Sequence, residues 1–171
     1  MSINLNPFPQ IETENYLLRR LNSEDAEAIF QIRSNKEIAK YLDRPLAKSL
    51  DDALQFIVKI EAGISKNEVV YWGICDKSKN KIVGTITLWQ ILEVEKTAEI
   101  GFELLPQFQG FGAMQEVIPK VIDFGFSNLQ LLEINGEVDS QNVKSIALMK
   151  KFGFKFKSEL ENTHLYSLIK S

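Results

Sequence analysis

The strongest constraint on the fold is a change of periodicity in the middle of the chain. Residues 98–105 alternate as a strand does, and the apolar residues at 114, 117, 118, 121 and 122 recur at helical spacing. Gly110 and Gly112 lie between the two patterns, so we predict a glycine-containing loop at 106–112 and a helix that begins near Phe111. Glycines let the backbone approach a ligand closely, and a helix start with unpaired amides attracts phosphate.

Two common phosphate-binding patterns do not fit this loop. No Gly-Lys-Ser/Thr sequence ends it, which excludes a Walker loop. Gln115 stands where a dinucleotide fingerprint would place its third glycine, and no βαβ unit precedes the loop. Taken alone, the two glycines are more typical of a plain tight turn, and it is their place between a strand and an amphipathic helix that favours a phosphate site.

Periodicity and capping residues divide the remainder of the chain into short elements. We predict strands at 16–21, 69–75, 82–91, 98–105, 131–138, 154–160 and 163–169. We predict helices after a cap at Asn22 or Ser23, at 36–41, from Ser49, and from Asp139 or Ser140 to a stop at Gly153. This order predicts a mixed sheet with helices on both faces, formed by a single domain that spans 1–171.

Two details of the helices are open to test. The helix from Ser49 is expected to bury one apolar stripe. Its members are Leu50, Ala53, Leu54, Ile57, Val58 and Ile60. Pro119 falls inside the helix after the glycine loop, where a proline costs about 3 kcal/mol or bends the helix.

Composition limits the class of protein. The chain has 171 residues, of which 44% are hydrophobic and 25% charged, and its net charge is -3. An acidic chain argues against nucleic-acid binding. The sequence has no signal-peptide pattern and no apolar run of membrane-spanning length, so we expect a cytoplasmic protein without membrane contact. The single cysteine, Cys75, is expected to be buried and inert, and a dyad with His164, the one histidine, is not expected.

Three segments, in order, resemble the GNAT superfamily of N-acetyltransferases, and specifically its ribosomal-protein (RimJ/RimL-like) branch. Residues 14–26 are similar to the opening strand and helix of that branch. Gln107, Gly110 and Gly112 fit the superfamily signature Arg/Gln-x-x-Gly-x-Gly/Ala. Residues 142–154, with Asn142 and Ser145 near their start, resemble the asparagine-bearing helix and its Gly-Phe end.

The resemblance implies a fold and a cosubstrate. The fold would be a mixed α/β, mostly antiparallel sheet of about seven strands, splayed where acetyl-CoA binds, with helices on both faces. The pyrophosphate would lie on the amides of residues 109–113, and the pantetheine arm would pair with the backbone of residues 103–105. The implied coenzyme-binding residues are Leu104, Leu105, Gln107, Gln109, Gly110, Phe111, Gly112, Ala113, Met114, Asn142 and Ser145.

This chain departs from the family pattern at three places. Phe111 stands where a lysine or arginine is common, which weakens the attraction for phosphate. Met114 replaces a usual alanine. Met149 stands where many members have a tyrosine that protonates the leaving thiolate. The backbone amide donors survive all three changes.

A catalytic base is predicted on the strand at 98–105. An amine acceptor arrives as an ammonium, and a positioned carboxylate is the usual group that removes its proton. Glu99 and Glu103 share one face of the strand with Gly101. The resemblance implies Glu99 as the base, with Glu103 as the second choice; solvation on an exposed sheet face is the alternative for both.

The remaining roles are less specific. Ser145 is the candidate proton donor to the thiolate, and packing against coenzyme is its alternative role. Tyr41, Trp89 and Glu103 are candidate acceptor-binding residues, although Tyr41 and Trp89 also suit simple packing. Arg44 lies in the loop at 41–45, which is expected to contact the acceptor together with the early helices, and a surface pair with Asp43 is the alternative role for Arg44.

Several acceptors and one alternative class stay open at this point. The branch name suggests a protein N-terminal amine, and a small-molecule amine is the alternative. A non-catalytic acetyl-CoA-binding module is a further alternative. No metal is expected, and the sequence is compatible with a homodimer.

Overall fold

The computed structural model describes residues 2–171, and its centre is one sheet of eight strands. The strands are β1 (Ile11–Glu12), β2 (Tyr16–Arg19), β3 (Val70–Asp76), β4 (Lys81–Leu92), β5 (Thr97–Leu104), β6 (Glu133–Asp139), β7 (Lys155–Glu159) and β8 (Thr163–Ile169). The helices are α1 (Ala26–Arg33), α2 (Lys36–Ala39), α3 (Leu50–Ser65), α4 (Ala113–Ser127) and α5 (Val143–Lys151), with short 3-10 turns η1 (Ser23–Asp25) and η2 (Pro106–Phe108).

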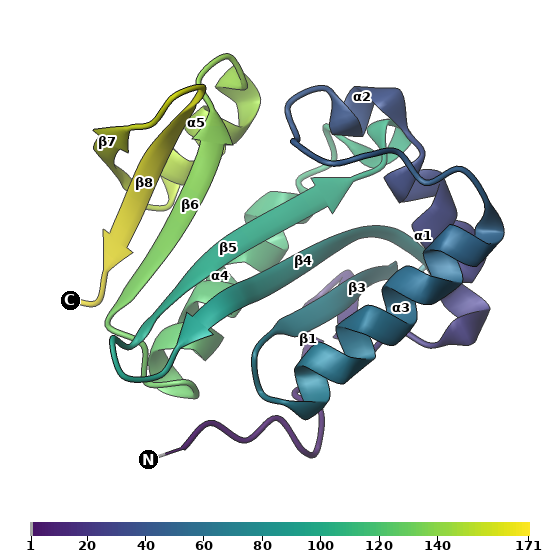
Figure 1. Ribbon diagram of the computed structural model, residues 1–171, viewed down its shortest axis with the longest axis horizontal. Coiled ribbons are helices and arrows are strands. Elements are labelled where there is room, and N and C mark those ends of the chain that lie inside the picture. Colours follow the sequence, from purple (N-terminus) through teal and green to yellow (C-terminus); the bar gives the residue numbers. More distant parts are fainter. Residues whose placement is uncertain (1) are drawn as a thin grey trace.

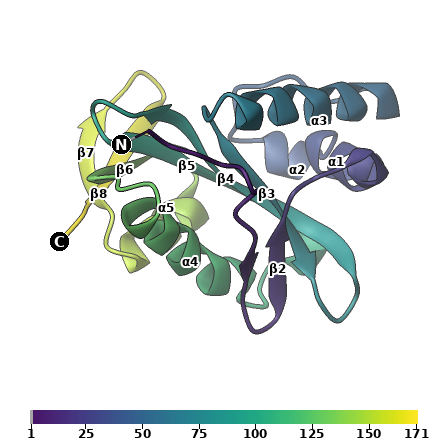
Figure 2. The ribbon, with the colours of Figure 1, turned by 90° about the horizontal axis from the view of Figure 1, so that it is seen from below.

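Figures 1 and 2 show α1, α2 and α3 on one face of the sheet and α4 and α5 on the other. The mixed sheet with helices on both faces, predicted from the order of elements, is therefore confirmed. The sheet has eight strands rather than about seven because β1, only two residues long, is too short to show an alternating pattern.

The sheet opens at one place. Its order is β1-β2-β3-β4-β5-β6-β8-β7, and β5 and β6 form the one parallel pair. That pair runs only from Thr97 opposite Glu133 to Glu99 opposite Asn135. Beyond Glu99 the two strands separate, as Figure 1 shows, so the sheet is splayed, as the family resemblance implied.

Alternation along the strands assigns a different core to each face. Trp72 of β3 points toward α4, where its ring lies 5.4 Å from that of Phe124 in an edge contact. Its neighbour Tyr71 points the opposite way and lies 5.5 Å from Phe56 of α3. Edge contacts of this kind fix the two helix layers against the sheet that holds the site between them.

Capping residues explain where the helices begin. Asn22 forms a capping box with Asp25, and the Ser49 hydroxyl accepts from the amide of Asp52 at the start of α3. The predicted start at Asp139 or Ser140 was wrong, because β6 continues to Asp139 in pairing with Thr163. Asn142 caps α5 instead.

The predicted stripe of α3 was partly wrong. Leu50 and Val58 are exposed, whereas Ala53, Ile57 and Ile64 are buried. The error is one of width, since the helix buries a narrower face against α1 and the sheet than the sequence suggested.

Three further features of the fold concern Pro119, Cys75 and the length of the helices. Helix α4 continues through Pro119; the carbonyl that loses its intrahelical partner there belongs to exposed Gln115, so water can reach it. Cys75 is buried as predicted, and three strands separate β3 from β8, which carries His164. Over residues 2–171, the helices are too short or too polar to cross a bilayer.

Candidate active site

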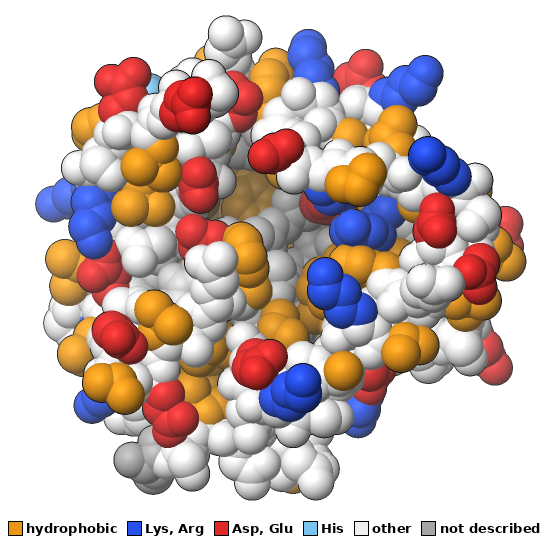
Figure 3. Space-filling model, in the orientation of Figure 1, with side chains coloured by type: hydrophobic (Ala, Val, Ile, Leu, Met, Phe, Trp, Pro, Cys, Tyr) orange, Lys and Arg blue, Asp and Glu red, His pale blue; other side chains and the backbone are white. Residues whose placement is uncertain are grey.

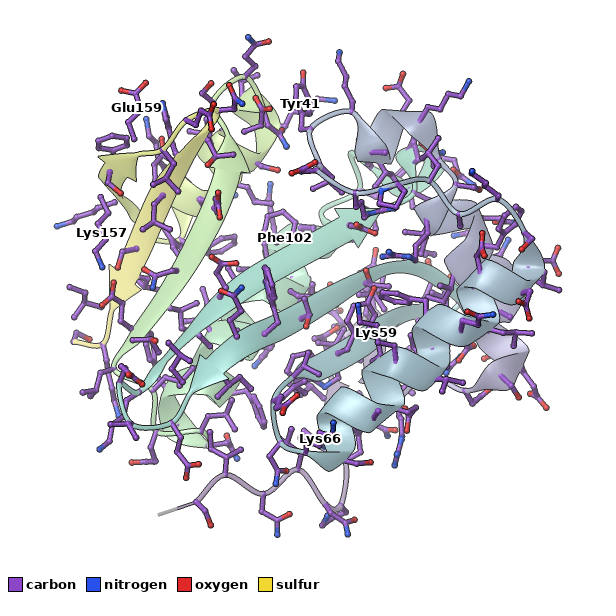
Figure 4. All side chains as sticks on the ribbon, viewed as in Figure 1. Tyr41, Lys59, Lys66, Phe102, Lys157 and Glu159 are labelled. Carbon is purple, nitrogen blue, oxygen red and sulfur yellow. The ribbon has the colours of Figure 1, made fainter. Side chains whose placement is uncertain are left out.

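The separation of β5 and β6 creates a cavity of about 660 Å³. Its walls come from α2 and the residues after it, from β5, from the loop and first turn of α4, from β6 and from α5. Figure 3 shows the hollow on the face that carries α3, and Figure 4 shows Tyr41 at its α2 rim and Phe102 on β5 beside the opening. The cavity therefore connects the two faces of the sheet.

The loop before α4 presents its backbone to this cavity. Gly110 and Gly112 adopt φ values of 87° and 81°, a left-handed conformation that favours glycine. Gly112 is the N-cap of α4, and the amides of Ala113 and Met114 have no helical acceptor, as in the first turn of any α-helix. These donors and the helix dipole make the loop suitable for a diphosphate.

One predicted donor is already in use. The amide of Gln109 donates to the carbonyl oxygen of Pro106 at 3.1 Å, so this amide has an acceptor within the chain. The Gln109 side chain donates instead to the carbonyl oxygen of Leu104 at 3.0 Å and ties the loop to the end of β5. The loop is held in place by this bond, and the free amides begin at Gly110.

The structure places most of the predicted coenzyme residues around the cavity. Those that line it are Leu104, Gln109, Gly110, Gly112, Ala113, Met114, Asn142 and Ser145. Gln107, Phe111 and Leu105 do not line it. Leu105 is buried, and its amide donates to Val83, while Phe111 is 79% exposed beside a second, smaller hollow that includes Lys77.

On α5, Met149 occupies the position at which many members of the resembling family have a tyrosine. Met149 is buried against β6, and a Cβ atom added to Gly136 would lie 2.1 Å from its Cε atom. The sulfur side chain thus fills the space that Gly136 leaves. Ser145, one turn earlier on the same helix, lines the cavity and is the hydroxyl that remains at this wall.

On the face that carries α3, the predicted base lies at the apex of the splay. Glu99 shares this face with Gly101 and Glu103, as its pairing with Trp89 and Asn135 requires. Burial, and then the charge of Glu137, raise the pKa of Glu99 above its ordinary value. A half-buried carboxylate with a raised pKa is suited to accept a proton from an amine.

The strand residue beside Glu99 on this face is a glycine. A Cβ atom on Gly101 would lie 3.3 Å from Cγ2 of Thr87 and 3.7 Å from Nε1 of Trp89, so β4 leaves little space for a side chain there. Trp89 itself is 40% exposed and lies beside Glu99 across β4 and β5. Glu99 and Trp89 stand at the closed end of the splay, next to the cavity wall that begins at Ile100.

Glu103 forms an ion pair with Arg44, for which the sequence suggested Asp43 as the partner. Arg44 donates to Oε1 of Glu103 at 3.0 Å, and both side chains are 15% exposed. The alternative in which Arg44 forms a surface pair with Asp43 was therefore wrong. Arg44 also donates to the carbonyl oxygen of Arg33, so it fastens the segment after α2 to the sheet.

Two features of the site were not found from the sequence. The Arg44–Glu103 pair joins residues 59 apart, and nothing local signals it. Glu137 of β6 also lines the cavity. Alternation along the predicted strand could have identified it, because it shares one face with Glu133 and Asn135.

Comparison with known proteins assigns the family. Residues 15–155 match the acetyltransferase (GNAT) domain, and the chain belongs to that family. It is 32% identical to the uncharacterized N-acetyltransferase YoaA of Bacillus subtilis (strain 168), over 95% of this chain and 98% of that protein. The protein is thus an N-acetyltransferase with acetyl-CoA as its cosubstrate.

Two solved structures share the fold. The ribosomal-protein-S5-alanine acetyltransferase of Vibrio fischeri has a TM-score of 0.84 at 23% identity, and the alignment covers 94% of this chain and 96% of that chain. The spermidine N-acetyltransferase of Vibrio cholerae, in complex with CoA and spermine, has a TM-score of 0.81 at 22% identity, with coverage of 91% and 95%. Identities this low show the fold alone, and the two acceptors named differ.

Proposed function

We propose that the protein transfers acetyl from acetyl-CoA to a primary amine by direct attack in a ternary complex, with Glu99 as the general base. The observation that carries the proposal is the position of Glu99. It is half-buried, its pKa is raised, and it lies at the apex of a splay that has the unpaired amides of α4 on one side and an open face on the other.

The coenzyme would enter from the α4 and α5 side. Its pyrophosphate would accept from the amides of Gly110 to Met114, and Asn142 and Ser145 would face it from α5. Asn142 already uses its side-chain oxygen to cap Ser145, at 3.3 Å, so its part is to shape the wall. The pantetheine arm would lie along β5, where that strand has lost its partner β6.

The backbone of β5 offers a donor for the transition state. The amide of Leu105 points to Val83 on β4. Because successive amides in a strand point to opposite sides, the amide of Leu104 faces the opening. It is the donor we assign to the oxyanion of the tetrahedral intermediate.

The reaction then proceeds in three steps. Glu99 takes a proton from the acceptor ammonium, and the free amine attacks the thioester carbonyl carbon. The intermediate collapses with cleavage of the carbon–sulfur bond. Ser145 gives a proton to the departing thiolate and regains one from solvent, since Met149 has none to give.

The acceptor is either a protein N-terminal amine or a small amine. The RimJ/RimL-like segments of the sequence favour the first, and the charge distribution on the open face favours the second. Both arrive as ammonium ions at neutral pH, because their pKa values lie near 8 and above. We place this reaction in the cytoplasm.

Thiol release from acetyl-CoA in the presence of peptides and small amines tests the proposal. Turnover should be lost in Glu99→Gln with binding of acetyl-CoA retained, whereas Glu103→Gln should keep part of the activity. Loss in Glu103→Gln but not in Glu99→Gln would transfer the base role to Glu103. Tight coenzyme binding with no turnover on any amine would make the protein a binding module.

A further inference from the structure

One carboxylate at the site has no role in the chemistry described so far. Glu137 lies on β6, across the splay from Glu99, and lines the cavity. Asn135 stands directly opposite Glu99, so Glu137, two residues further along β6, points to the same face of the sheet. That face is the open one, away from α4 and α5.

The two carboxylates can attract a common ligand. With strands about 4.8 Å apart and a rise of about 3.3 Å per residue, the backbones of Glu99 and Glu137 are at least about 8 Å apart. Gly101 puts no side chain between them. The charge of Glu137 raises the pKa of Glu99, so the two carboxylates interact electrostatically and a cation placed between them is attracted to both.

Glu137 is held in position but not neutralised. Its Oε1 atom accepts from the hydroxyl of Thr163 at 2.7 Å. Within residues 2–171, neither Glu137 nor Glu99 forms an ion pair. Glu133, on the same face of the same strand, is paired with Lys157 and bonded to Ser167.

The basic groups of the open face do not cancel this charge. Arg44 is ion-paired with Glu103, and Arg33 stacks on Phe56 under α3, 3.7 Å from its ring centre.

Two lysines also line the cavity, Lys40 at 5.3 Å from the ring centre of Tyr41 and Lys144 on α5, and neither is ion-paired with Glu99 or Glu137. Glu137 lines a cavity that opens to solvent, and within residues 2–171 neither it nor Glu99 has the positive charge of an ion-pair partner. The acceptor is the molecule that can supply it.

We infer that Glu137 is a specificity-determining residue which, with Glu99, forms a two-carboxylate site for amines that carry a second positive charge. The inference rests on the proposed function. As Glu99 takes the proton of the attacking ammonium, Glu137 keeps its charge and holds the remaining cation of the acceptor. A monoamine leaves that carboxylate unpaired, and an acceptor with its own carboxylate is repelled.

Three acceptors of matched length test this inference: 1,4-diaminobutane, butylamine and 4-aminobutanoate. For the unmodified protein, kcat/KM should fall in that order. In Glu137→Gln, kcat/KM for the diamine should fall at least tenfold more than kcat/KM for 4-aminobutanoate, so that the three acceptors differ less from one another. Glu137→Asp keeps the charge and should keep the order.

Glu133→Gln is the matched control, because it removes the same charge from the same face of β6 outside the cavity. It should leave the ranking unchanged. An equal loss for all three acceptors in Glu137→Gln, or an unchanged ranking, would overturn the inference and assign Glu137 a structural role. Turnover of peptides but of none of the three small amines would also overturn it, yet leave the proposed function intact. Absence of turnover with every amine would overturn both.

Discussion

The two sides of the cavity present different kinds of groups. The proposed coenzyme side presents backbone: glycines with positive φ and the unpaired amides at the start of α4. The proposed acceptor side presents charged side chains from β5, β6 and the segment after α2. Lys144 is the cationic side chain that α5 contributes to the cavity wall, and the loop before α4 contributes no charged side chain. The opposite side of the cavity carries the carboxylates of Glu103 and Glu137.

This difference indicates which side can change during evolution. Backbone donors do not depend on side-chain identity, so substitutions such as that at Phe111 leave them in place. A carboxylate that is replaced loses its charge entirely. A family with one coenzyme and many acceptors is expected to be built in this way, and the following predictions test whether this chain is.

The largest expected effect is on chemistry alone. Glu99→Gln should lower kcat by roughly 10²–10⁴-fold, the usual contribution of a general base. The dissociation constant of acetyl-CoA, measured by calorimetry, should stay within about twofold because Glu99 faces away from α4. A large loss of coenzyme affinity would contradict the separation of the two sides.

The next effect is on stability. Arg44→Ala leaves the Glu103 carboxylate half-buried without its cation, and should lower the free energy of unfolding by about 1–3 kcal/mol. It should also raise KM for the amine, because the segment after α2 loses its attachment. Arg44→Ala combined with Glu103→Gln should recover part of the stability in thermal unfolding. If the double variant is less stable than Arg44→Ala, the two residues are not coupled.

A third prediction concerns the loop before α4, where a substitution at Gly112 should strain the backbone and weaken acetyl-CoA binding. An L residue in the left-handed region costs about 1–2 kcal/mol, so Gly112→Ala should rotate the loop amides and raise KM for acetyl-CoA by about tenfold. Gly153 has a φ of 89° at the end of α5, outside the cavity. Gly153→Ala should show a similar loss of stability with no change in KM for acetyl-CoA. Equal KM effects in both variants would mean that global strain, and not amide geometry, is being measured.

The contrast between the two sides also explains what the sequence could predict. The strand, glycine loop and helix around residues 98–122 are local, so periodicity and spacing predicted this segment, and its loop residues line the cavity. Glu99 and Glu103 followed from alternation on one strand. The start of α5 was misplaced because Asp139 and Asn142 are both good caps, and only the pairing of β6 with β8 decides between them.

Long-range contacts set the limit on the acceptor side. The pairing of Arg44 with Glu103 depends on how the segment after α2 folds back over β5, which no local pattern encodes. The closeness of Glu137 to Glu99 depends on the parallel register of β5 and β6. Sequence reasoning thus predicted the part of the cavity wall that one continuous segment forms, and it missed the contacts that bring separate segments together.

A smaller effect concerns pH. Burial and the charge of Glu137 both raise the pKa of Glu99, so kcat/KM should fall as pH decreases through a pKa above that of an ordinary glutamate. Glu137→Gln should move this acid limb to lower pH, because the protonated form of Glu99 loses its electrostatic support. Other titratable groups line the cavity, namely Glu37, Lys40, Tyr41, Glu103, Asp139 and Lys144, but Glu137 is the charge that shifts Glu99. An unmoved limb in Glu137→Gln, with Glu133→Gln as control, would assign the limb to another group.

The smallest expected effect is a change in acetyl-CoA affinity when a positive charge is added beside the loop before α4. Phe111 is 79% exposed beside the free amides, and a lysine there would lie near the diphosphate but in solvent. Exposed charge pairs contribute about 0.2–1 kcal/mol, so Phe111→Lys should tighten acetyl-CoA binding by about two- to fivefold at low salt. The gain should vanish at about 1 M salt, where the screening length is about 3 Å. Phe111→Gln, which removes the ring without adding charge, separates the effect of the cation from that of the aromatic side chain. A gain above tenfold that persists in salt would mean that side-chain charge limits coenzyme binding, and the division between a backbone side and a charged side would fail.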